Sequence, residues 1–133
     1  MTGHYPESAS SYREAAEIAR QLGDQTLLAS NLGNEGTIAL MQGNLKMAVT
    51  LFGQSLAVAT NSGDRRIQAV RIFQLGTALL EAGELDSALE DYQKARTLFQ
   101  ELGELFNESM VLIGISQVPV SYTHLTLPTI YSV

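Results

Sequence analysis

The stretch GTALLEAGELDSALEDYQKARTLFQELG, residues 76–103, decides the fold because it repeats an earlier stretch, GTIALMQGNLKMAVTLFGQSLAVATNSG, residues 36–63. Positions that differ by 40 in residue number carry the same or a similar residue type at the points that set the pattern. The matched pairs are Gly36 and Gly76, Gly43 and Gly83, Ala48 and Ala88, Phe52 and Tyr92, and Gly63 and Gly103. Internal repetition with a period of about 20–50 residues indicates an architecture of stacked repeats.

Apolar residues recur at helical spacing on both sides of each glycine turn, which predicts helices separated by short turns. The predicted helices span residues 5–22, 25–41, 45–62, 65–81, 85–102 and 105–117. Gly76 and Ala88 are small enough to let two helices approach closely, and Tyr92 is expected to fill the groove beside them. A bulky residue in place of Ala88 should therefore cost about 1–3 kcal/mol through overpacking. Gly53, inside a helix, is expected to mark another close contact.

The repeated unit resembles the tetratricopeptide repeat, in which an aromatic, Leu-Gly, a second aromatic, Ala and Phe recur at fixed offsets. In the second unit these slots hold Ile72, Leu75, Gly76, Leu79, Ala88 and Tyr92. In the first unit they hold Leu32, Glu35, Gly36, Ala39, Ala48 and Phe52, so that a glutamate stands in the leucine slot. Thr60 and Gln100 stand where the family has Pro, and the step of 40 exceeds the usual ~34 residues. Such long units resemble the arrays of large bacterial signalling and transcription proteins.

The repeat and the resemblance together predict an all-α fold, a right-handed solenoid of stacked helix–turn–helix units. The repeat domain is expected over residues 1–117. Its predicted parts are a half repeat at 3–22, full repeats at 24–63 and 64–103, and a partial repeat at 104–117.

The repeat pattern stops near the C-terminus, and residues 120–133 resemble the translation of a sequencing adapter. We therefore expect residues 118–133 to be a non-native or disordered tail, with a genuine polar tail as the alternative. On either interpretation the missing half repeat at the front favours a segment of a longer array.

The composition narrows the classes of function. The chain has 133 residues, 45% of them hydrophobic, and a formal net charge of −6 with no Cys and no Trp. A disulfide scaffold is excluded, and no apolar run reaches the ~18 residues of a membrane span. The first residues lack a secretory signal, so a cytoplasmic location is expected. Direct nucleic-acid binding is disfavoured because it needs a basic surface.

Catalysis finds little support in the residue types present. The two histidines are His4 and His124, both near chain ends, and no His or Cys cluster has the spacing of metal ligands. No phosphate-binding loop of the Gly-x-x-x-x-Gly-Lys kind occurs. The chain is therefore predicted to be no enzyme and to need neither cofactor nor metal.

The resemblance implies that the first helix of each unit lines a concave groove that holds a peptide or a partner helix. The groove positions would be Ser30, Gly33, Asn34, Thr37, Val70, Phe73, Gln74 and Thr77. Asn34 occupies a slot where the family often clamps a peptide backbone, and Arg71 is a further candidate, as an anchor for an acidic group. The alternative is that these residues are ordinary polar surface.

Two other functions stay open at this point. The segment could be a structural spacer or oligomerisation element, because the helix after residue 104 is apolar and stacked repeats need polar ends. Self-association would then use Met110, Leu112 and Ile113. The segment could also be the regulatory arm of a larger enzyme.

Overall fold

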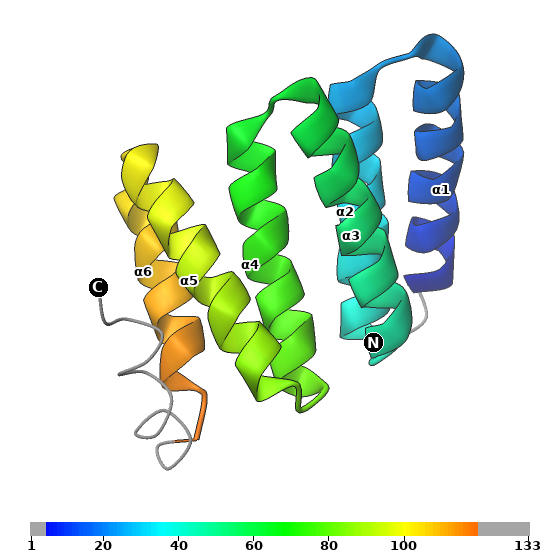
Figure 1. Cartoon of the computed structure of the whole chain (residues 1–133). Coiled ribbons are helices and arrows are strands. Elements are labelled where there is room, and N and C mark those ends of the chain that lie inside the picture. The colour runs from blue at the N-terminus through cyan, green and yellow to red at the C-terminus, as the bar shows by residue number, and fades with distance from the viewer. Residues whose placement is uncertain (1–4, 120–133) are drawn as a thin grey trace.

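The computed structural model describes residues 5–119 and consists of helices alone over that range (Figure 1). The helices are α1 (Tyr5–Leu22), α2 (Gln25–Met41), α3 (Leu45–Ser62), α4 (Arg65–Glu81), α5 (Leu85–Glu101) and α6 (Leu105–Ser116). The sequence predicted these bounds to within one residue. The predicted adapter-like tail and the first residues of the half repeat lie outside the described residues.

Each helix packs against its neighbours in the chain, and α2 additionally contacts α4. The pairs α2–α3 and α4–α5 are the two full repeats, while α1 corresponds to α3 and α5 by the step of 40 residues. The helices thus form a row in which each helix pair packs against the next (Figure 1). The predicted all-α solenoid of helix–turn–helix units is confirmed.

The turns repeat as regularly as the helices. A glycine with a φ between 70° and 82° stands at the end of each of the first five helices, every 20 residues from Gly23 to Gly103. Such positive φ values suit glycine because it has no Cβ. Asp24, Asn44 and Asp64 then cap the next helix, each accepting a hydrogen bond from the backbone N–H three residues on. Turn and cap together set the sharp reversal between successive helices.

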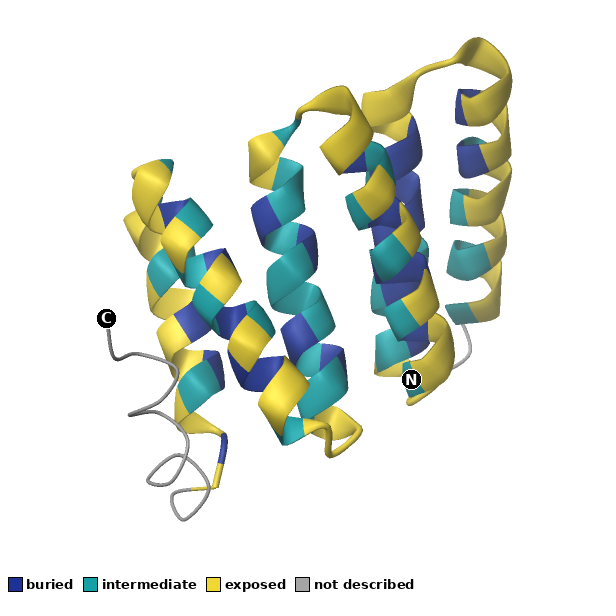
Figure 2. Ribbon diagram, in the orientation of Figure 1, coloured by how far each residue is buried: buried dark blue, intermediate teal, exposed yellow. Residues whose placement is uncertain are grey.

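In each helix pair, small residues and one aromatic ring pack between the two helices. Phe52 packs against Gly36 so tightly that an added Cβ would lie 2.7 Å from the ring, and Tyr92 approaches Gly76 in the same way. Ala48 and Ala88 are fully buried. Figure 2 shows the buried residues on the sides of the helices that face one another. The close approach predicted from Gly76, Ala88 and Tyr92 is therefore confirmed.

Two local predictions need correction. Gly53 was expected to mark a close contact, yet a Cβ added there would meet nothing within 4 Å. The tail was expected from residue 118, yet Val118 is buried and its N–H donates to the carbonyl of Ile115. Packing therefore continues past residue 117, because Val118 closes the end of α6 rather than starting a separate segment.

Candidate peptide-binding face

The predicted groove residues come from two matching helices. Ser30, Asn34 and Thr37 are spaced so that they share one side of α2. The Gln74 amide on α4 donates to the Thr37 hydroxyl on α2 over 3.3 Å, which makes the corresponding side of α4 its direct neighbour. We call this surface the α2–α4 face; its residues are Ser30, Asn34, Thr37, Val70, Phe73, Gln74 and Thr77. Asn34 is exposed, and the other six are half-buried.

Arg71 is one of two predicted groove residues that lie elsewhere. It is 8% exposed, and its guanidinium is inserted between the repeats. Nε donates to the Ser55 hydroxyl over 2.7 Å, and the terminal nitrogens donate to the Gln74 side chain over 2.9 Å and to the Ala29 carbonyl over 3.5 Å. Burial lowers the pKa of Arg71 below its ordinary value. Arg71 therefore joins α2, α3 and α4 and does not stand on the open surface.

Gly33, also predicted to face the groove, is buried beneath Arg71. A Cβ added to Gly33 would lie 2.1 Å from the guanidinium, so a glycine is needed for the arginine to fit. The Ser55 hydroxyl, fully buried, donates to the Ala29 carbonyl over 2.6 Å while it accepts from Arg71. Ser55 was not among the predicted site residues. The available signal was a paired departure, since the second repeat has Phe73 and Ala95 at the positions of Gly33 and Ser55.

Several residues of the α2–α4 face also support the fold. The Tyr92 hydroxyl donates to Thr77 over 3.1 Å, and Thr77 donates to the Phe73 carbonyl. The Phe73 and Tyr92 rings lie 5.7 Å apart and are tilted by 44°. Gln74 orients Arg71 from the open side. By contrast, the Asn34 side chain makes no hydrogen bond within residues 5–119, so its amide is available to another molecule.

Within residues 5–119 no three His, Cys, Asp or Glu side chains are grouped so that they could hold a metal ion. No helix there is both long and apolar enough to cross a membrane.

Comparison with known proteins gives one family. The model of the tetratricopeptide repeat matches the chain twice, over residues 1–61 and 29–101. The two matches end 40 residues apart, which is the step of the repeat. No curated protein is similar enough to the chain to count as a match.

Proposed function

Because the chain belongs to the tetratricopeptide repeat family, whose members generally serve as protein–protein interaction modules, we propose that it binds an extended peptide or a partner helix on the α2–α4 face. The observation that carries this proposal is Asn34: an exposed amide with no partner within residues 5–119, beside the half-buried Thr37. A primary amide offers both donors and an acceptor, which is what a peptide backbone requires.

The face supplies apolar contact next to this polar group. Val70 and Phe73 are half-buried on α4, and Phe73 is held in place by its contact with Tyr92. An aromatic side chain that is already fixed loses little conformational entropy when a ligand packs against it. Asn34 would thus orient a peptide backbone, and Phe73 would take up an apolar side chain of the ligand. The 40-residue step resembles the long repeats of bacterial signalling arrays, and this supports a role within a larger regulatory protein.

Asn34 is also the best position for a test. Gln74 and Arg71 support the repeat interface, so changing them alters stability as well as binding. We would select peptides from a displayed random library on the whole chain and then measure their affinity for N34A. The control is Q54A, which removes another exposed amide, on α3. We expect N34A to weaken binding by about tenfold, as the loss of 1–1.5 kcal/mol of hydrogen bonding implies, with unchanged thermal stability. Equal affinity for N34A and Q54A would contradict the proposal.

Self-association is the second candidate function, and the end helix α6 favours it. Leu105 and Phe106 are 75% and 78% exposed, and Leu112 and Ile113 are also exposed. The residue that matches Leu112 in the first repeat, Leu32, belongs to a buried core cluster and is only 3% exposed. A second copy of the chain would cover this surface on α6. Light scattering should show a mass that rises with concentration and returns to that of the monomer in F106D; a monomer at every concentration would contradict this candidate.

A further inference from the structure

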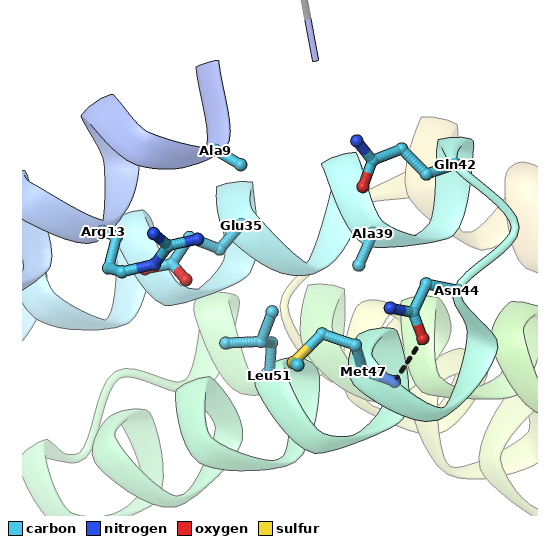
Figure 3. Close-up of a pocket in the computed structure, with 8 residues that line it drawn as sticks. All are labelled: Ala9, Arg13, Glu35, Ala39, Gln42, Asn44, Met47 and Leu51. Carbon is cyan, nitrogen blue, oxygen red and sulfur yellow. Dashed lines mark hydrogen bonds between the residues drawn. The ribbon is translucent and has the colours of Figure 1, made fainter. Parts of the chain in front are cut away.

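A cavity of about 220 Å³ lies between α1, α2 and α3 (Figure 3), and Asn34 is not among the residues that line it. Its lining combines an apolar floor with a polar mouth. The lining residues are Ala9, Arg13, Glu35, Ala39, Gln42, Asn44, Met47 and Leu51. Ala39 and Leu51 are buried, whereas Arg13, Gln42, Asn44 and Met47 are exposed. The cavity is therefore open to solvent at one end and apolar at the other.

The cavity exists because the first repeat carries smaller or more polar residues than the second. Glu35 and Ala39 correspond to Leu75 and Leu79, and Ala9 corresponds to Val49. Leu75 is partly buried and packs against the core cluster, as a leucine in that slot should. Replacing two leucines by Glu and Ala leaves space and adds a carboxylate. Glu35 and Ala39 give up apolar packing of the kind that Leu75 keeps, so this departure from the repeat calls for a reason.

Glu35 adds a half-buried carboxylate to the lining of the cavity. Its carboxylate is half-buried and makes no hydrogen bond, and no ion pair within 4 Å, anywhere in residues 5–119. Burial raises the pKa of Glu35, while the charges of Arg13 and Arg20 act in the opposite direction. Figure 3 shows Arg13 reaching from α1 toward Glu35. The cavity thus holds a hydrogen-bond acceptor without a donor, close to positive charge.

We propose that this cavity binds a single aromatic ring that carries a hydroxyl group, the chemistry of a phenol. The volume suits one ring, since an engineered apolar cavity of about 150 Å³ is known to take up benzene. Ala39 and Leu51 give the ring an apolar floor, and the thioether of Met47 can contact its edge. The hydroxyl would donate to Glu35, satisfying the free carboxylate.

The surrounding charges select a neutral ligand. Arg20 does not line the cavity and is paired with Glu17 over 3.3 Å, so Arg13 and Glu35 are the charges that a ligand meets. An ammonium group would be attracted by Glu35 but repelled by Arg13, and an anionic group would be attracted by Arg13 but repelled by Glu35, so neither charged ligand gains much. A neutral donor avoids both costs and is favoured by the charged acceptor. Two sources share this chemistry, a free small phenol and the tyrosine side chain of a protein partner.

The test uses the whole chain and four probes: p-cresol, toluene, n-butylamine and N-acetyltyrosinamide. Binding is followed by the chemical shifts of the backbone amides of Ala39 and Leu51. We expect p-cresol to bind about tenfold more tightly than toluene, because toluene lacks the donor. Binding of N-acetyltyrosinamide would assign the cavity to a partner's tyrosine, and its failure beside bound p-cresol would assign the cavity to a free phenol. Toluene binding as tightly as p-cresol, or n-butylamine binding more tightly, would overturn the proposal.

Two variants separate cavity shape from acceptor. A39L installs the residue of the second repeat and should abolish p-cresol binding with no loss of thermal stability. E35M keeps the side-chain length but removes the acceptor, so p-cresol and toluene should bind equally well. N34A is the control and should leave p-cresol binding unchanged, because this site does not depend on the α2–α4 face. Undiminished p-cresol binding in A39L, or an undiminished preference for p-cresol in E35M, would show that the probe binds elsewhere and overturn the proposal.

Discussion

The two full repeats, residues 24–63 and 64–103, have matching helices but differently filled interiors. The first contains small or polar residues, Gly33, Glu35, Ala39 and Ser55, where the second contains Phe73, Leu75, Leu79 and Ala95. In the first repeat this leaves room for the guanidinium of Arg71 and for a cavity of about 220 Å³. The second repeat instead holds a pair of aromatic rings, Phe73 and Tyr92.

Comparing the two repeats separates the residues that the fold requires from the residues that can vary. Both repeats keep a glycine on the first helix and an aromatic ring on the second helix that packs against it. Both also keep a buried alanine on the second helix. Positions outside this contact carry different chemistry in each repeat. We infer that the shared positions maintain the solenoid, whereas the departures build features that belong to one repeat, namely the Arg71 network and the cavity beside Glu35.

The largest expected effect comes from the shared ring. Tyr92 is fully buried against Gly76 and Gly114, so it contacts both the helix before it and the helix after it. Y92A should lower the free energy of unfolding by about 3–5 kcal/mol, measured by urea denaturation. Y92F keeps the ring and loses only the hydrogen bond to Thr77, so its loss should be about 1 kcal/mol. Similar losses in both variants would mean that ring packing does not hold the second repeat together.

Glycine substitution tests how tightly the first repeat packs around the Arg71 guanidinium. In G33A the new methyl group would overlap the Arg71 guanidinium, and overpacking of this kind costs about 1–3 kcal/mol. G53A is the matched control, because Gly53 is also inside a helix but has open space around it. Alanine there should raise stability by about 0.5–1 kcal/mol through helix propensity. Two variants that change stability in the same direction would argue against the tight fit at Gly33.

The caps give a smaller effect that again differs along the chain. Asp64 accepts a hydrogen bond from the Ile67 N–H over 3.0 Å, whereas Glu84 makes no such bond at the start of α5. D64A should therefore cost about 1 kcal/mol in chemical denaturation, and E84A should cost close to nothing. E84N should gain stability, since asparagine can cap the helix. A loss in E84A equal to that in D64A would contradict this account of the turns.

The smallest effect is the pH dependence of the first repeat. Burial raises the pKa of Glu35 above its ordinary value of 4.5, so the folded chain holds this proton more tightly than the unfolded chain. Its contribution to stability is present below pH 4.5 and is lost as the pH rises through the folded pKa. The stability of E35Q relative to the unchanged chain should therefore increase with pH across that window. Asp91, whose pKa burial also raises, is common to both chains and cancels in the difference. A difference independent of pH would contradict the burial of Glu35.

The sequence predicted the fold because its signals are local and repeated. The glycine turns, the helical spacing and the step of 40 residues located the six helices of residues 5–119, and Gly76 with Tyr92 predicted the tight helix contact. The Arg71 network could not be predicted in this way. Whether an arginine points outward or inward depends on Gly33 and Ser55, which come from other helices. The cavity was likewise hidden: Glu35 stood out as a departure from the family, but only packing reveals the space beside it.

The most direct test of the account is a double-mutant cycle between Ser55 and Arg71, because it asks whether one repeat is bonded to the next. S55A installs the residue of the second repeat, and R71M keeps the length of the side chain while removing its charge. The Ser55–Arg71 hydrogen bond of 2.7 Å predicts that the two changes are coupled by about 1 kcal/mol or more in the free energy of unfolding. Losses that simply add, within about 0.3–0.5 kcal/mol, would contradict the claim that Arg71 joins the two repeats into one stack.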